Sequence, residues 1–401
     1  MLAVGLHLGL SSGLSMGGLS ALMGEKNSQA AAATSTENLE TEALFAAARR
    51  DADGDFSAAL FTMKGDLRSI PLPGRGHDLA ARPHSRDVVV FARRPGRFAI
   101  VFSPNLKIDP LLFHAQAGRH FYGHGVFSPD GRLLFTSEND YEDGVGKIGI
   151  RDASKGYQQI GEFSSYGVGP HDLALLMDGR TLVVANGGLE TSPTSGRQIL
   201  NLATMEPSLV YIDTQSGDLL EKHVLARSLH QLSIRHLTIA SHNRVAFGCQ
   251  YKGAAGDQPA LVGFHDRGSE PQLFHAPDDV QPALKNYIGS VAVDPFGDVI
   301  AASAPRGNMI TFWRAADGKY LGREILTDGC GVARGAERHG FLLTSGHGVK
   351  KLGQPDLEGP ADEPENSAVK SPEIKSDTIN ASAFESQTTR FQWDNHAVRV
   401  R

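Results

Sequence analysis

Cysteine is scarce in this chain, and there is no excess of positive charge. Cys249 and Cys330 are the two cysteines among 401 residues, too few for a disulfide framework. We interpret them as small buried packing residues, with a soft metal-ligand or redox role as the alternative. Lys and Arg number 39 against 45 Asp and Glu, and the formal net charge is −6. Without a basic field to neutralise phosphates, nucleic-acid binding is not expected.

Charged side chains are also missing from the start of the chain, where no Asp, Glu, Lys or Arg precedes Glu25. Residues 1–23 are apolar but interrupted by Gly and Ser, which makes a poor stable membrane span. They are typical of the apolar part of a secretory signal, although the usual basic leading segment is lacking. We therefore predict a truncated signal segment over residues 1–33 and a periplasmic protein. The alternative is a flexible apolar tail on a cytosolic protein.

Turn-forming residues are abundant, with 45 Gly and 20 Pro, and they separate copies of one hairpin pattern. "HGVFSPDGRLLFTSEND" from His124 and "HDLALLMDGRTLVVANGG" from His171 are two such copies. Further copies open at His77, His236, Ser290 and Cys330, at intervals of roughly 40 to 65 residues. Strand-like runs between the hairpins bring each unit to about four strands, which is typical of a β-propeller blade.

A seventh blade is divided between the two ends of the chain. His396–Val400 restarts the hairpin pattern without partners, whereas the strand-like runs from Phe56 and Leu67 have no opening His. Pairing them closes the ring and removes exposed sheet edges. The sequence therefore predicts an all-β, seven-bladed β-propeller whose last blade is closed by N- and C-terminal strands.

The domain organisation follows from this repeat. Residues 34–54 form a linker, and the polar, Ala-rich stretch over residues 25–50 could include a short helix. The propeller blades occupy residues 55–349, and residues 391–401 supply the closing strand. Residues 350–390 are poor in aromatics and rich in Pro, Glu, Ser and Asp, which predicts a low-complexity insertion between blades six and seven.

Several long segments resemble a known family. "GRHFYGHGVFSPDGRLLFTSENDYEDG", "GVGPHDLALLMDGRTLVVANGG", "NYIGSVAVD" and "WDNH" are similar to the bacterial domain-of-unknown-function family 1513, over residues 55–349 and 391–398. The resemblance implies a seven-bladed propeller, exported in many members by a twin-arginine signal and encoded near imelysin-like and di-haem peroxidase-like iron-uptake proteins. It implies a periplasmic accessory role with metal-uptake partners, and no established activity. This sequence lacks the leading Arg-Arg pair and carries the long insertion.

The repeat predicts a polar funnel at one mouth of the central channel. The innermost strand of each blade runs along the channel, so its opening residue and the end of the returning second strand meet at the same mouth. The candidate ligand-binding residues of this funnel are His77, His124, His171, His236, His396, Glu138, Asn139, Asp140, Asn186, Gln250, Arg306, Tyr122, Arg235 and Asn395.

Two interpretations of the opening His residues remain. Each His could hydrogen-bond to neighbouring backbone and cap its strand, because other propellers also place a His there. Alternatively, the imidazoles hold a transition metal, with His124, His171, His236 and Glu138 as candidate ligands. We predict a ligand-binding or scaffold accessory protein in iron or metal uptake. The alternative is a metal-dependent or lactonase-like propeller enzyme that uses the same funnel.

Overall fold

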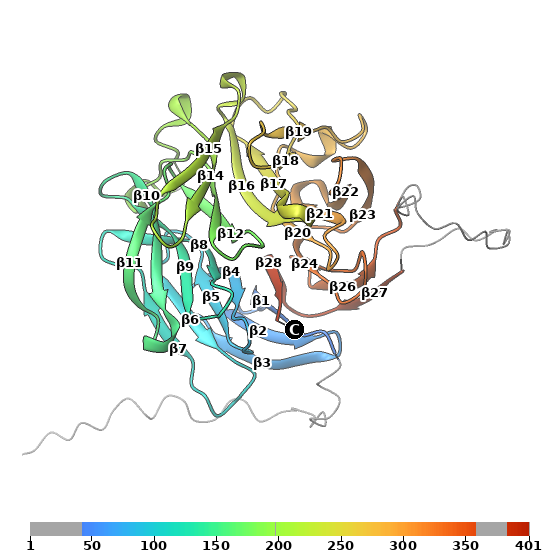
Figure 1. Ribbon diagram of the computed structural model, residues 1–401. Coiled ribbons are helices and arrows are strands. Elements are labelled where there is room, and N and C mark those ends of the chain that lie inside the picture. The colour runs from blue at the N-terminus through green and yellow to red at the C-terminus, as the bar shows by residue number, and fades with distance from the viewer. Residues whose placement is uncertain (1–41, 197, 358–382, 401) are drawn as a thin grey trace, which may run out of the picture. The chain divides into compact units, whose positions relative to one another are not determined.

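The computed structural model describes residues 42–196, 198–357 and 383–400 of the chain. Residues 43–400 of this range belong to one compact unit that contains seven four-stranded antiparallel sheets. The sheets are arranged as blades in a ring, with the first strand of each blade nearest the axis (Figure 1). The predicted seven-bladed propeller is confirmed, and each predicted opening residue lies in an innermost strand.

The strands follow the chain from blade to blade. Blade 1 contains β28 (Gln392–Arg399), β1 (Phe45–Arg50), β2 (Phe56–Thr62) and β3 (Gly65–Pro71), and blade 2 contains β4 (Gly76–Ala81), β5 (Val88–Ala92), β6 (Phe98–Phe102) and β7 (Leu111–His114). Blade 3 contains β8 (Arg119–Phe127), β9 (Leu133–Asp140), β10 (Val145–Asp152) and β11 (Gln158–Ser164), and blade 4 contains β12 (Pro170–Leu175), β13 (Thr181–Asn186), β14 (Ser208–Asp213) and β15 (Leu219–Val224).

The remaining three blades have the same order from the axis outward. Blade 5 contains β16 (Leu232–Ile239), β17 (Val245–Tyr251), β18 (Val262–His265) and β19 (Gln272–Phe274), and blade 6 contains β20 (Ser290–Val293), β21 (Val299–Ala304), β22 (Met309–Arg314) and β23 (Tyr320–Ile325). Blade 7 contains β24 (Gly329–Arg334), β25 (Phe341–Ser345), β26 (Val349–Gln354) and β27 (Ala383–Thr388). Short 3-10 helices lie in the connections at Ala153–Lys155, Pro193–Ser195, Leu202–Thr204, Arg227–Leu229, Ser241–Asn243, Pro282–Leu284 and Pro305–Gly307.

The core lies between adjacent blades, and it explains the apolar runs of the sequence. The second strands β5, β13, β21 and β25 are buried along their whole length because a neighbouring blade covers each face. An outer strand such as β11 instead alternates between exposed and partly buried residues. This difference between inner and outer strands is typical of blades packed face to face.

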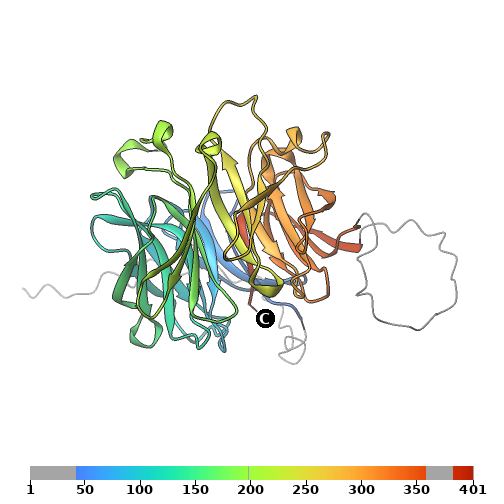
Figure 2. The ribbon, with the colours of Figure 1, turned by 45° about the horizontal axis from the view of Figure 1, so that its top comes forward.

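Blade 1 is completed by both ends of the folded chain. β28 pairs antiparallel with β1, and β24 and β4 flank it on the two neighbouring blades. Figures 1 and 2 show this red C-terminal strand between the blue N-terminal strands and the orange strands of blade 7. The predicted closure by N- and C-terminal strands is confirmed, because β28 is the innermost strand of blade 1 and pairs with β1.

The structure differs from the expected boundaries in two places. Residues 45–50, expected within the linker, form strand β1, because their small and apolar side chains are buried between β28 and β2. The insertion expected over residues 350–390 starts later, since β26 and β27 pair as the outer hairpin of blade 7. The remaining insertion residues 358–382 and the predicted signal segment lie outside the described residues. Among the described residues, no helix is long and apolar enough to cross a membrane.

Candidate functional site

Five imidazoles meet on the axis of the ring. Contacting rings have centroids 4.7–5.7 Å apart, and every one of the five contacts at least two others. All five side chains are buried. We refer to this group as the axial His cluster; it consists of His77, His124, His171, His236 and His396.

Irregular strand pairing accompanies these side chains. In six of the seven innermost strands, the register with the second strand shifts at or beside the opening residue. Such a bulge adds a residue to one strand and redirects the side chains next to it. β20 is the exception, because Ser290 pairs with Ser303 in regular register. The bulges accompany the opening residues that gather at the axis.

Gly123 makes room for the cluster next to His124. Its φ is +105°, a conformation that favours glycine, and a Cβ at this position would overlap the ring of His77. The imidazole of His77, from the preceding blade, occupies the space that a side chain at position 123 would need.

His124 differs from the other four imidazoles because it contacts two carboxylates. Its Nδ1 lies 2.9 Å from Asp78 Oδ2 and 3.3 Å from Asp172 Oδ1. Burial alone would lower its pKa, but Asp172 and Asp78 together raise the pKa of His124 to about 9. His124 is therefore an imidazolium at neutral pH, with its Nδ1–H between carboxylates from the two adjacent blades.

The other four cluster imidazoles are neutral. Burial lowers the pKa of His77, His171 and His236 well below the usual value, and the positive charge of His124 adds to the effect. Burial also lowers the pKa of His396 to about 4. These four rings therefore offer nitrogen lone pairs at physiological pH.

Many of the ring nitrogens have no hydrogen-bond partner. A buried polar atom without a partner costs about 1–3 kcal/mol, so such atoms are rare in folded proteins. Within the part of the chain that the structure describes, buried and unpartnered nitrogens in the cluster are His77 Nδ1, His124 Nε2, both nitrogens of His171, His236 Nδ1 and His396 Nε2.

Ligand-capable atoms come within 4.8 Å of one another in three sets on the axis. Two sets contain only imidazoles, and His124 belongs to both. The third set adds the carboxylates that contact His124. The three sets are His77, His124 and His396; His124, His171 and His236; and Asp78, His124 and Asp172.

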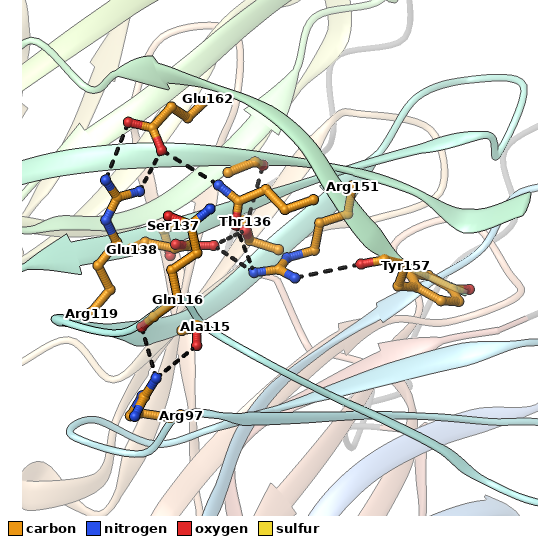
Figure 3. Close-up of polar contacts among 12 residues, drawn as sticks. Arg97, Ala115, Gln116, Arg119, Thr136, Ser137, Glu138, Arg151, Tyr157 and Glu162 are labelled. Carbon is orange, nitrogen blue, oxygen red and sulfur yellow. Dashed lines mark hydrogen bonds and ion pairs between the residues drawn. The ribbon is translucent and has the colours of Figure 1, made fainter. Parts of the chain in front are cut away.

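Glu138, predicted as a metal ligand, belongs to none of these sets. Its carboxylate accepts hydrogen bonds from Arg151 at 3.0 Å and from Thr136 at 2.8 Å, between the second and third strands of blade 3. Figure 3 shows Arg151 lying between Glu138 and Tyr157. The ion pair with Arg151 already balances the charge of Glu138, which lies outside the axial sets.

Three other predicted residues support the blades without joining the cluster. Asp140 forms an ion pair with Arg119 at 3.2 Å. The amide of Asn186 donates to the Ser165 carbonyl at 2.9 Å. Asn139 donates to Nε2 of His120 at 3.0 Å and thereby sets the tautomer of a residue at the mouth of the axis.

Ser290 and Cys330 are the two opening residues that are not His. Ser290 Oγ lies 3.3 Å from His396 Nδ1, so it contacts the cluster. The Cys330 thiol instead donates to the Asp394 carbonyl at 3.3 Å. Cys249 and Cys330 are both free and buried, and burial raises both thiol pKa values. Neither thiol is a reactive thiolate at neutral pH, which favours their interpretation as packing residues.

A cavity of about 910 Å³ opens above the cluster at the mouth of the axis. His77, His171 and His236 belong to both the cluster and the cavity lining. The other predicted funnel residues that line the cavity are Tyr122, Arg235, Gln250, Arg306 and Asn395.

Residues that the sequence analysis missed complete this site. Asp78 and Asp172 each follow an opening His in the tetrapeptide His-Asp-Leu-Ala, which occurs twice in the sequence. This repeat could have identified both carboxylates as candidate site residues. Four further basic lining residues were missed because they lie in the connections between strands. These additional lining residues are Arg75, Arg93, Arg94 and Lys252.

Two other groups of His and carboxylates lie away from the axis, and several of their atoms are already bonded; the groups are Glu221, His223 and His265, and Asp294, Asp298 and His339. In the first, His265 contacts Tyr211 OH at 2.5 Å and the Ser269 carbonyl at 2.9 Å. In the second, Asp294 accepts backbone N–H groups of Val299 and His339. Both arrangements stabilise turns or outer strands and leave fewer open ligand atoms than the axial His cluster.

Comparison with known proteins gives one family match. The sequence model of a family described as "Protein of unknown function (DUF1513)" matches residues 70–400. Comparison with curated proteins found no match.

Solved structures share the architecture at low sequence identity. A chain of Kuenenia stuttgartiensis hydrazine synthase has a TM-score of 0.54 and 14% identity, covering 74% of this chain and 91% of that chain. A chain of a mitotic checkpoint complex has a TM-score of 0.50 and 14% identity, covering 69% and 76%. At such identities the similarity concerns the fold alone.

Proposed function

Because this chain belongs to the family described as protein of unknown function (DUF1513), whose description names no activity, we propose a function from the axial His cluster. The propeller binds a transition-metal ion on its axis and acts as a ligand-binding accessory protein in metal uptake. One observation carries this proposal: the buried cluster contains six ring nitrogens without a hydrogen-bond partner. Metal coordination would satisfy several of them at once.

The surroundings of His124 also support metal binding. A metal-ligating His usually donates its second ring N–H to a carboxylate, which fixes the tautomer and orients the ring. His124 donates from Nδ1 to Asp78 and Asp172, and this leaves Nε2 toward the other imidazoles. Among the described residues, His124, His171 and His236 are therefore the best candidates for the metal ligands.

Charge balance favours a divalent ion in this environment. Two carboxylates contact one imidazolium, so the group of Asp78, Asp172 and His124 carries a net negative charge. A divalent ion bound to neutral His124 would balance both carboxylates. Imidazole ligands suit copper, zinc, nickel and iron, all of which this proposal admits.

The periplasm is the proposed location, with other metal-uptake proteins of that compartment as partners. The uncharged apolar residues 1–23 and the resemblance of the repeat segments to a family with many exported members support this location. An accessory role fits a site built from ligands on the axis of a rigid ring.

We expect copper(II), zinc or nickel to raise the melting temperature of metal-free protein. Binding only to the folded state should add about 2.7 kcal/mol to the free energy of unfolding at a metal concentration one hundred times Kd. The double variant His171→Asn, His236→Asn should lose this increment and remain folded, since His171 and Nδ1 of His236 have no hydrogen bonds to lose. Differential scanning fluorimetry with isothermal titration calorimetry measures both effects.

His114→Asn is the matched control for this experiment. His114 lies exposed on the edge strand β7, so its replacement should leave the full metal response. An unchanged melting temperature with all three metals, or an equal loss of response in the control, would contradict the proposal.

Metal binding at pH 7 should release close to one proton per ion. The metal must displace the proton on His124 Nε2, whose pKa is about 9, whereas the other four imidazoles are already neutral. Affinity should rise about 50-fold between pH 7 and pH 9, because the neutral fraction of His124 rises from about one hundredth to one half as the pH reaches that pKa. Calorimetry in buffers of different ionisation enthalpy counts the protons.

The double variant Asp78→Asn, Asp172→Asn tests the origin of this proton. Without the carboxylates, the pKa of His124 should fall and proton release at pH 7 should disappear. Metal binding by the wild-type protein at pH 7 without proton release would mean that His124 is not a ligand or that it is not an imidazolium in the metal-free protein.

A further inference from the structure

The cavity above the axial His cluster carries charge of a single sign. Six basic side chains line it, and no carboxylate does so among the residues that the structure describes. The whole chain contains more acidic than basic residues, so composition does not explain this lining. The six basic residues are Arg75, Arg93, Arg94, Arg235, Lys252 and Arg306.

Arg235 is the strongest indication of a ligand. Its side chain lines the cavity, the residue is only 6% exposed, and its Nε is buried without a hydrogen-bond partner. Burial lowers the pKa of Arg235 to about 9, and the charge of Arg94 adds to the effect. A buried guanidinium without a compensating anion is costly, so such groups are concentrated at functional sites.

Lys252 and Arg306 are two further basic side chains of the cavity, and the groups that they contact are uncharged. Lys252 Nζ donates to the amide oxygen of Gln250 at 2.9 Å. Burial lowers the pKa of Lys252 to about 7, and Arg235, Arg306 and Arg94 contribute. The guanidinium of Arg306 lies 4.3 Å above the ring of Tyr287. These contacts orient the two side chains and bring no negative charge to them.

Arg75 shows the contrasting arrangement at the rim. Its Nε donates to Asp394 at 2.6 Å, so this cation is already paired. The uncompensated charge is therefore concentrated where Arg235, Lys252 and Arg306 lie. Arg235 also lies close enough to His171 and His236 for its charge to lower their pKa values.

We propose that this cavity binds a small, multiply charged oxyanion with carboxylate or phosphate groups. Its volume falls within the range of sites for small organic ligands. Guanidinium groups bind both oxyanion types in two-point geometry, and several of them favour a ligand with more than one charge. This inference goes beyond metal binding and requires no metal ion.

Calorimetry with metal-free protein, prepared on a chelating resin and kept at low ionic strength, tests the proposal. Citrate, pyrophosphate and inorganic phosphate serve as probes, with acetate and glycerol for comparison. We expect saturable binding of citrate or pyrophosphate, at least tenfold tighter than acetate, and none of glycerol. A preference for citrate identifies a polycarboxylate, and a preference for pyrophosphate identifies a phosphate compound. Absence of saturable binding by all three probes would overturn the proposal.

Variants distinguish a ligand-binding arginine from a structural one. Arg235→Gln should weaken anion binding about 30-fold or more, and should not lower the melting temperature of the ligand-free protein because it removes an uncompensated buried cation. Arg132→Gln, which changes an exposed arginine in the turn between β8 and β9, should bind as the wild type does. Equal weakening in both variants, or a strongly destabilised Arg235→Gln, would refute the assignment. Since no metal is present, a negative metal titration leaves this result unaffected.

Discussion

Lowering the pH from 7 to 5 should destabilise the metal-free propeller by roughly 8 kcal/mol if four axial imidazoles stay neutral in the folded state. His77, His171, His236 and His396 have lowered folded-state pKa values, whereas their unfolded values are near 6.5. The stability that they contribute is present above pH 6.5 and is lost as the pH falls toward the folded-state values. Each neutral ring adds about 1.4 kcal/mol per pH unit to this loss.

His124 opposes this effect only slightly. Its raised pKa gives a contribution that is present below pH 6.5 and is lost as the pH rises through about 9, so it gains less than about 1 kcal/mol between pH 7 and pH 5. Urea unfolding at pH 7, 6 and 5 measures the free energy of unfolding directly.

The variant His171→Asn, His236→Asn is the control for the acid effect. Two of the four titrating rings are removed, so the dependence on pH should fall to about half that of the wild type. A free energy of unfolding that is constant between pH 7 and 5 would mean that the imidazoles accept protons in the folded state.

Replacing His124 by Gln should destabilise the protein by about 3 kcal/mol at pH 7, the free energy that corresponds to its pKa shift. The substitution keeps a hydrogen-bond donor but removes the positive charge between Asp78 and Asp172. The two part-buried carboxylates then repel each other without an intervening cation. Equilibrium unfolding in urea provides the measurement.

A double-mutant cycle tests this account of His124. In the background Asp78→Asn, Asp172→Asn, the change His124→Gln should cost less than half as much, because the carboxylates that it balanced are gone. An equal cost in both backgrounds would show that His124 acts through packing alone. This result would also remove the basis for expecting proton release on metal binding.

The fold could be predicted almost completely from the sequence because propeller blades repeat one local pattern. Each copy contains its own apolar alternation, turn and second strand, so the blade count follows from neighbouring residues. His77, His124 and His171 begin equivalent strands, and equivalent strands of a ring meet at the axis. The boundaries were less accurate at β1 and β26, where residues 45–50 and 349–354 lack a distinctive local pattern.

The chemistry within the axial site depended on residues from different blades. The sequence determined that several imidazoles meet at one mouth, but their ionisation depends on which carboxylates the ring places beside them. Only the tertiary structure places Asp78 and Asp172 on either side of His124, and pairs Glu138 with Arg151 instead. It also brings Arg235 of strand β16 together with Lys252 and Arg306, which lie in two different connections, in one cavity whose described lining has no carboxylate. Charge interactions depend on distance in space, and the periodicity of the sequence specifies the strands but not these distances.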